Sequence, residues 1–133
     1  PVLPETKRML LENSRITFAG WQNDIRPYLA ASDVFVFPSY REGFPNVVLQ
    51  AGAMGLPCIV TDINGCNEII CHGVNGLIIP SHDESALLKA MKFMLTDEHA
   101  RMEMAGKSRE LIGSRYERSF LWNEIRKTYQ SLE

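Results

Sequence analysis

The fold is decided by residues 33–61, where two apolar runs, Asp33-Val-Phe-Val-Phe37 and Pro57-Cys-Ile-Val-Thr61, flank the segment Pro38-Ser-Tyr-Arg-Glu-Gly-Phe-Pro-Asn46. Both runs are continuously apolar rather than alternating, which is typical of strands buried on both faces of a parallel sheet. Between them, residues 45–54 predict a helix with Pro45 in its first turn and Gly55 as its stop. A strand, a helix and a second strand in this order predict a parallel unit with a crossover helix.

The same alternation continues on both sides of this unit. Ile16-Thr-Phe-Ala19 and Gly76-Leu-Ile-Ile-Pro80 predict two further strands. Helices are expected over residues 24–31, 83–95, 98–112 and 117–132. We therefore predict an α/β fold with a doubly wound, Rossmann-like parallel sheet and a helical C-terminal segment, in a single domain over residues 1–133. In such folds ligands bind in the crevice beyond the carboxyl ends of the strands.

Composition argues against several classes of function. The 133 residues carry 14 Lys and Arg against 16 Asp and Glu, and this lack of basic excess predicts no nucleic-acid partner. The spacing of Cys58, Cys66 and Cys71 matches no zinc or redox pattern, so we expect reduced thiols in a cytoplasmic protein. The three histidines are scattered along the chain, and we expect no metal site. They are His72, His82 and His99.

The loop after the first central strand holds the most informative candidate site. Gly43 allows backbone to approach a ligand, and Pro45 opens a helix whose first N–H groups are unpaired and partly positive. Such a helix start suits a phosphate group, although an ordinary strand-turn-helix connection has the same spacing. Glu42 precedes the helix and Gln50 lies on it, so the pair could bind two ends of an extended nucleotide sugar. The alternatives are a solvated carboxylate at Glu42 and a surface amide at Gln50.

Neighbouring loops add weaker candidates, each with two interpretations. Arg41 either meets a phosphate or is exposed to solvent. Asp62 and Asn64 follow the third predicted strand, where turn chemistry explains them as well as ligand contact does. Glu68 is either a crevice carboxylate or a cap for the turn that follows it. Trp21 either stacks near a base or covers the end of the sheet.

Five stretches of the chain, in this order and spacing, resemble the carboxyl-terminal domain of the retaining family-4 (group 1) glycosyltransferases. The resemblance runs from about residue 14 to the end, and its motifs are far more specific than a lone glycine pattern. It implies the GT-B arrangement, in which two Rossmann-like domains face each other across a cleft. The stretches are Phe18-Ala-Gly-Trp21, residues 29–51, Gly55-Leu-Pro-Cys-Ile-Val-Thr61, Glu68-Ile-Ile70 and Gly73-Val-Asn-Gly-Leu-Ile-Ile-Pro80.

The resemblance also implies a donor site for a nucleotide sugar. A UDP-sugar is the first candidate donor and a GDP-sugar the second. Transfer in that family retains the anomeric configuration and needs no bound metal and no cofactor. The implied contacts follow the donor from its sugar to its base. They are Glu42, Gly43, Phe44 and Pro45 for the sugar, Asn46 and Val47 for the diphosphate, Gln50 for the ribose, and Gly20, Trp21 and Gln22 for the base.

This sequence departs from the family in two respects. The glutamate that binds ribose in the family is Gln50 here, and an amide cannot chelate a diol as a carboxylate does, which puts donor affinity in question. The two opening strands of the family's donor domain, its basic pair for the diphosphate and its partner domain do not precede Ile16. We therefore expect a fragment of a longer enzyme that is inactive alone, and we assign no catalytic residue to it.

The last predicted helix carries an apolar stripe formed by Trp122, Ile125, Tyr129 and Leu132. The stripe either docks on this domain's own core or, as the resemblance implies, packs on the amino-terminal domain. Left uncovered, it is expected to drive self-association of the fragment.

The function predicted is the donor-binding part of a retaining glycosyltransferase that transfers a sugar to a glycan or lipid-linked acceptor in bacterial polysaccharide synthesis. The full-length enzyme would act in the cytoplasm, at the inner face of the membrane if it is peripheral. The alternative is a non-catalytic Rossmann-like regulatory or interaction domain. A phospho-receiver of that class needs acidic residues where Gly20 and Trp21 end the first predicted strand, and this disfavours it.

Overall fold

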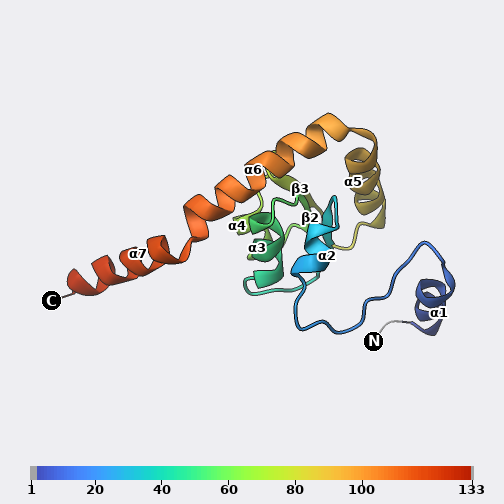
Figure 1. The fold of residues 1–133 in the computed structure, drawn as a ribbon, viewed down its shortest axis with the longest axis horizontal. Coiled ribbons are helices and arrows are strands. Elements are labelled where there is room, and N and C mark those ends of the chain that lie inside the picture. The colour runs from blue at the N-terminus through green and yellow to red at the C-terminus, as the bar shows by residue number, and fades with distance from the viewer. Residues whose placement is uncertain (1–2, 133) are drawn as a thin grey trace.

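Three parallel strands form the centre of the structure, a computed structural model that describes residues 3–132. β1 (Phe35–Phe37), β2 (Cys58–Thr61) and β3 (Gly76–Ile79) lie side by side in chain order, with β2 in the middle (Figure 1). In the register, Val36 of β1 is level with Ile59 of β2, which is level with Leu77 of β3. The predicted parallel sheet is therefore confirmed for the strands over residues 33–37, 57–61 and 76–80.

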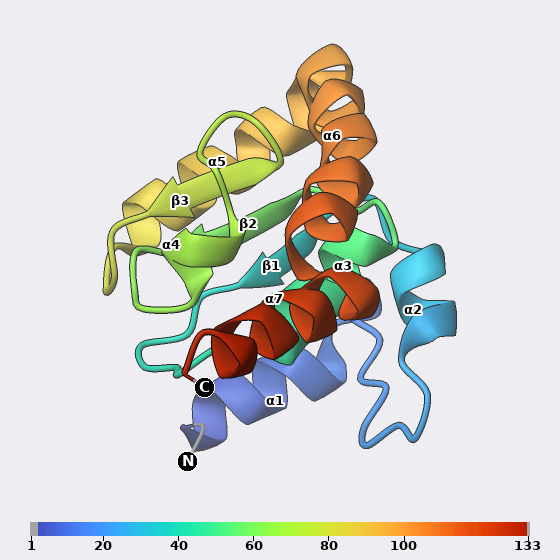
Figure 2. The same ribbon diagram turned by 90° about the vertical axis from the view of Figure 1, so that its left-hand side faces the viewer.

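Helices cover both faces of this sheet, as predicted. One face is covered by α3 (Asn46–Ala53) and α4 (Cys66–Ile69), and the other by α5 (Glu84–Thr96), as Figure 2 shows. α6 (Glu98–Tyr116) contributes to both sides, with Ile112 in the first cluster and Met104 in the second. The crossover from β1 to β2 runs through α3 and the crossover from β2 to β3 through α4. The α/β class with helices on two faces is thus confirmed.

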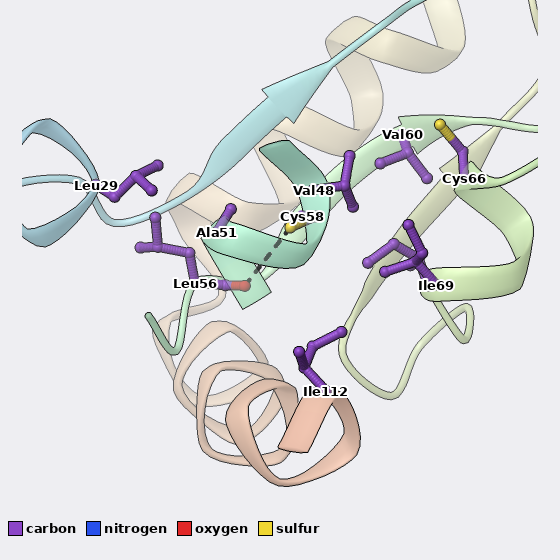
Figure 3. Close-up of a cluster of buried hydrophobic side chains, with 10 residues drawn as sticks. Leu29, Val48, Ala51, Leu56, Cys58, Val60, Cys66, Ile69 and Ile112 are labelled. Carbon is purple, nitrogen blue, oxygen red and sulfur yellow. Dashed lines mark hydrogen bonds between the residues drawn. The ribbon is translucent and has the colours of Figure 1, made fainter. Parts of the chain in front are cut away.

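The residues of β2 alternate between two separate apolar clusters. Cys58 and Val60 face the cluster under α3, α4 and α6, while Ile59 faces the cluster under α5. All three side chains are fully buried, which explains why the sequence of this strand is continuously apolar. Figure 3 shows the first cluster, in which β2 meets Leu29, Val48, Ala51, Leu56, Cys66, Ile69 and Ile112.

The predicted helices are confirmed, with small shifts at their ends. α2 (Arg26–Ala30) has Pro27 in its first turn, and α3 begins one residue later than predicted. Asp83 caps α5 by accepting from the Ala86 N–H at 2.8 Å, and α6 runs to Tyr116 rather than residue 112. α7 (Arg118–Gln130) follows directly. The sequence analysis missed α1 (Pro4–Glu12) and the one-turn helix α4.

The strand predicted over Ile16–Ala19 is wrong. These residues form no strand, and every one of them is exposed, Phe18 with 72% of its surface accessible. The segment runs from α1 to α2 outside the layers of the sheet (Figure 1). An apolar, β-branched sequence becomes a strand only when a neighbouring strand satisfies its N–H and C=O groups, and no described strand lies beside it.

The C-terminal helix α7 contacts α6 and projects away from the sheet (Figure 1). None of its residues is buried, and Trp122, Ile125 and Tyr129 expose between 47% and 70% of their surface. The interpretation that this stripe docks on the domain's own core is therefore wrong. Along residues 3–132, no helix combines the length and the apolar character that a bilayer crossing requires.

Candidate functional site

The loop that carries Glu42 leaves the carboxyl end of β1 and is held by two hydroxyl groups. Ser39 Oγ donates to Glu42 Oε1 at 2.7 Å. Thr61, the last residue of β2, donates through its Oγ1 to the carbonyl oxygen of Ser39. The neighbouring strand thus fixes the start of the loop, and the start of the loop fixes the Glu42 carboxylate.

Glu42 borders an open hollow of about 280 Å³ at the carboxyl ends of β1 and β2. The other lining residues are Tyr40 and Arg41 from the same loop and Ile63 and Asn64 from the loop after β2. The structure therefore brings Arg41, Glu42 and Asn64 together at the edge of the sheet where the crevice rule places ligands. Glu42 itself is half-buried, so its carboxylate keeps one side open to this hollow.

α3 begins directly after this loop, and no side chain of the described residues caps it. Pro45 is the N-cap, in an extended conformation, and its carbonyl oxygen accepts from the Val48 N–H at 3.0 Å. The N–H groups of Asn46 and Val47 belong to the first turn and point toward the loop, as at any helix start. Gln50 lies one turn further on, exposed on the same helix. The start of α3 is therefore open to an anion.

Gly65 lets the start of α4 pack against the start of α3. Its φ is +78°, and a Cβ atom built on it would lie 2.8 Å from Cδ of Pro45 and 2.9 Å from Cα of Phe44. Only glycine meets both conditions, because other residues rarely adopt this φ and would collide with the loop. The loop after β2 thus packs directly against the backbone of the Glu42 loop.

The two buried thiols, Cys58 and Cys66, are protonated at neutral pH. Burial, and then the neighbouring Glu42 carboxylate, raises the pKa of Cys66 to about 11. Burial, and then Cys66, raises the pKa of Cys58 to about 12. Neither thiol is suited to act as a nucleophile or a metal ligand, since both roles require the thiolate.

The end of α6 also reaches the site, through a contact that the sequence analysis missed. Tyr116 packs its ring against Phe44, with ring centroids 5.6 Å apart. Its hydroxyl donates to the carbonyl oxygen of Glu68 at 3.0 Å, and the Arg115 guanidinium donates to the same oxygen at 2.8 Å. The only sequence signal was the continuation of the helical pattern past residue 112, because partners 72 residues apart leave no local trace.

Three weaker candidates are now placed. Glu68 accepts from the Gly65 N–H at 3.3 Å, so it caps the start of α4, the turn before it, rather than the turn that follows it. Asp62 accepts from the Asn67 amide at 2.9 Å, which favours turn chemistry. Trp21 exposes 91% of its surface, so the interpretation that it covers the end of the sheet is wrong.

Gly20, Trp21 and Gln22 lie in the segment between α1 and α2, and none of them lines the Glu42 hollow. Gly20 has a φ of +65°, and Gln22 donates through its amide to the carbonyl oxygen of Ala19. Among the described residues, no group of three or more His, Cys, Asp or Glu side chains gathers as a metal ion would require.

Comparison with known proteins gives consistent matches. The sequence profile of the family "Glycosyl transferases group 1" matches residues 2–97. The lipopolysaccharide core biosynthesis glycosyltransferase LpsE of Rhizobium meliloti (strain 1021) is 35% identical over 106 residues, which cover 80% of this chain and 31% of LpsE. The UDP-Gal:alpha-D-GlcNAc-diphosphoundecaprenol alpha-1,3-galactosyltransferase of Escherichia coli is 42% identical over 84 residues, which cover 63% of this chain and 22% of that enzyme.

Among solved structures, Anabaena Alr3699/HepE in complex with UDP superposes with a TM-score of 0.87 at 26% identity, and its complex with UDP-glucose with a TM-score of 0.85. Each superposition covers 96% of this chain and 35% of HepE. The chain thus spans about a third or less of the length of these relatives. The fold is that of part of a GT-B enzyme, and the chain belongs to the group 1 glycosyltransferases.

Proposed function

We propose that this chain is the donor-binding part of a retaining glycosyltransferase that uses a nucleotide sugar. The observation that carries the proposal is the juxtaposition of a positioned carboxylate and an uncapped helix start. Glu42 is held by Ser39 at 2.7 Å, and α3 begins four residues later without a side-chain cap. A carboxylate accepts hydrogen bonds from sugar hydroxyls, and a helix start binds phosphate, so the two features match adjacent parts of one ligand.

The donor lies along this part of the chain in the proposal. Its sugar contacts Glu42 and the backbone of the loop, and its diphosphate accepts from the first N–H groups of α3. Gln50 is four residues after Asn46, which places it about 6 Å further along the helix, the direction in which the ribose follows the diphosphate. The proposed contacts are Glu42, Gly43, Phe44 and Pro45 for the sugar, Asn46 and Val47 for the diphosphate, Gln50 for the ribose, and Gly20, Trp21 and Gln22 for the base.

In this scheme the chain's own residues bind, orient and stabilise. The partial positive charge at the start of α3 stabilises the diphosphate as it leaves, without a metal ligand from this chain. Glu42 fixes the orientation of the sugar, so that the acceptor approaches from the side open to solvent. In the proposal, which takes retention from the family resemblance, the leaving group and the acceptor share one face of the sugar.

Gln50 alters the ribose end of the site. The Gln50 side chain offers one acceptor oxygen and an NH₂ donor, so it binds one ribose hydroxyl as acceptor and another as donor. One lost charge-assisted hydrogen bond costs about 1–2 kcal/mol of donor affinity relative to a glutamate. The proposal therefore assigns weaker ribose binding to this chain rather than no donor binding.

Our first candidate for the nucleotide is UDP, and our second candidate is GDP. HepE, one of the structural relatives, is known in complex with UDP and with UDP-glucose. The names of LpsE and of the Escherichia coli galactosyltransferase point to a glycan or lipid-linked acceptor in bacterial polysaccharide synthesis. We place the full-length enzyme in the cytoplasm, at the inner face of the membrane where such acceptors lie.

The apolar stripe of α7 fits the partner role predicted for it. Trp122, Ile125 and Tyr129 line a hollow that this chain leaves open. In the proposal the amino-terminal GT-B domain covers this stripe, and the fragment alone self-associates through it and is inactive. A second candidate function, a non-catalytic Rossmann-like domain, is favoured by one observation only, the amide at position 50.

Calorimetric titration of the full-length protein tests the proposal. UDP-glucose, UDP-galactose and GDP-mannose are titrated into wild type, and the tightest binder is then titrated into the variants. Glu42→Ala is expected to weaken nucleotide-sugar binding about tenfold or more, the effect of losing a charge-assisted contact. Glu110→Ala, an exposed change on α6, is the control and should bind as wild type does.

Near-wild-type binding and turnover in Glu42→Ala would contradict the role given to this residue. Gln50→Glu should keep or raise affinity, because it restores a carboxylate for the ribose. A severe loss in that variant would show that the amide has a specialised task. Failure of wild type to bind any nucleotide sugar would favour the non-catalytic alternative.

A further inference from the structure

Two aromatic rings from the loops that follow the two edge strands of the sheet stack on each other beside the proposed sugar site. The rings of Tyr40 and His82 lie nearly parallel, 10° apart in orientation, with their centroids 4.1 Å apart. Tyr40 follows β1 and His82 follows β3, while β2 lies between those two strands. The stack therefore crosses the carboxyl end of β2. It joins the loop after β1 to the loop after β3, two strands that are not paired with each other.

His82 adopts a backbone conformation that is uncommon for residues other than glycine. Its φ is +61°, and it is the one non-glycine residue with a positive φ in the part of the chain that the structure describes. Such strain persists where surrounding structure imposes it, and it is concentrated at functional sites. Next to it, Asp83 caps α5 through the Ala86 N–H, which ties His82 to the rigid start of that helix.

Tyr40 forms the wall between two hollows. On one side lies the hollow of about 280 Å³ that Glu42 borders. On the other side lies a hollow of about 240 Å³, lined by Tyr40 and His82 together with Thr61 and the start of α5. A shift of the Tyr40 ring therefore changes the shape of the space in which Glu42 lies.

The loop from Ser39 to Glu42 has anchors on one side that are already described. Thr61 holds the carbonyl group of Ser39, and Ser39 holds the Glu42 carboxylate. The two residues between them, Tyr40 and Arg41, are exposed, Tyr40 with 66% of its surface accessible. The stack on His82 restrains this exposed part of the loop from the β3 side.

We infer that His82 is a positioning residue that, through its stack on Tyr40, holds the Tyr40–Glu42 backbone in the conformation that binds the donor sugar. The inference rests on the proposed function, because it takes Glu42 as the sugar contact. It assigns His82 no contact with the diphosphate or the ribose. Its loss should therefore affect the sugar end of the donor and leave the nucleotide end unchanged.

The test separates these two ends in the full-length protein. The tightest nucleotide sugar of the calorimetric panel and its own nucleoside diphosphate are titrated into His82→Asn. Asparagine adopts a positive φ readily, so this change removes the ring and keeps the backbone. We expect the dissociation constant for the nucleotide sugar to rise about fivefold, within the range of one aromatic pair, and that for the nucleoside diphosphate to stay unchanged.

Glu110→Ala, the exposed change on α6, is the control and should bind both ligands as wild type does. Tyr40→Leu removes the stack from the other side and should reproduce His82→Asn. Wild-type binding of the nucleotide sugar by His82→Asn would overturn the inference, and so would equal weakening of both ligands. If Glu42→Ala also binds as wild type does, the proposed function itself fails; if Glu42→Ala weakens binding and His82→Asn does not, only the role of His82 fails.

Discussion

A Cβ atom on Gly65 would lie 2.8 Å from Cδ of Pro45, so the start of α4 touches the start of α3 where only a hydrogen atom fits. The contact joins the loop after β2 to the loop that carries Glu42. Position 65 requires glycine for two independent reasons, the positive φ of +78° and the lack of space for a Cβ atom. The geometry of the proposed donor site therefore depends on a residue that touches no ligand.

Replacing Gly65 by alanine should destabilise the protein and displace the Glu42 loop. The positive φ costs about 1 kcal/mol for alanine, and the collision adds about 1–3 kcal/mol. Urea unfolding of the full-length protein measures the sum. Gly73→Ala is the matched control, since Gly73 has a φ of +76° and open space around it, and should cost only the first amount. Equal losses in both variants would show that the contact with Pro45 is unimportant.

Two glycines of the helical layer should respond to alanine with opposite signs. A Cβ on Gly52 of α3 would lie 2.7 Å from Cγ1 of Ile112 and 3.2 Å from Oγ of Ser108, both on α6. Gly52→Ala should lower the free energy of unfolding by about 1–3 kcal/mol through overpacking. Gly113 of α6 has nothing within 4 Å, so Gly113→Ala should raise it by about 0.5–1 kcal/mol through helix propensity. The same sign in both variants would contradict the close packing of α3 on α6.

The three thiols should differ sharply in reactivity. Burial raises the pKa of Cys58 to about 12 and that of Cys66 to about 11, whereas Cys71 is only half-buried. Alkylation at pH 8 followed by peptide mapping should label Cys71 first, because the thiolate is the reactive form. Cys71→Ser should abolish this fast labelling. Rapid modification of Cys58 in the native protein would contradict the structure.

The same two pKa values predict alkaline destabilisation. A thiol whose folded-state pKa is raised contributes stability that is fully present below its unfolded value near 9. That stability is lost as the pH rises from about 9 through 11 for Cys66 and 12 for Cys58. Urea unfolding across this window should show a free energy of unfolding that falls as the pH rises. The fall should be smaller in Cys58→Ala than in wild type, after the pH-independent cost of the substitution has been subtracted. A slope unchanged by the substitution would contradict the assignment.

The α7 stripe should control the association state of the 133-residue chain. The double variant Ile125→Glu and Tyr129→Glu places charges on the exposed apolar stripe and should reduce self-association in sedimentation experiments. Ser131→Glu, at the C-cap of α7 and outside the stripe, is the control. A wild-type chain that stays monomeric at high concentration would contradict the prediction.

The parts of the fold that were predicted correctly are those whose signal is local. The strands at residues 33–37, 57–61 and 76–80 are short apolar runs, of which β2 is the fully buried one, and α5 follows the helical spacing of its apolar residues. The segment Ile16–Ala19 has residues of high β-propensity, but no described strand lies beside it. Whether a neighbouring strand is present cannot be inferred from the segment's own sequence. One-turn α4 is too short to show a helical period.

The candidate site divides in the same way. The hollow that joins Glu42 to Asn64 follows from the rule that ligands bind beyond the carboxyl ends of parallel strands. The supports of that hollow do not follow from any rule applied to the sequence, because each joins distant segments. Tyr116 on Phe44 and His82 on Tyr40 are contacts between side chains 72 and 42 residues apart, and only the folded chain shows them.

The central claim is that the start of α3 binds the diphosphate of a nucleotide sugar whose sugar is held by Glu42. A crystal structure of the full-length protein with its tightest-binding nucleotide sugar tests this most directly. Phosphate oxygens are expected within hydrogen-bond distance of the Asn46 and Val47 N–H groups, and a sugar hydroxyl on the Glu42 carboxylate. A diphosphate bound away from α3, or a sugar without contact to Glu42, would contradict it.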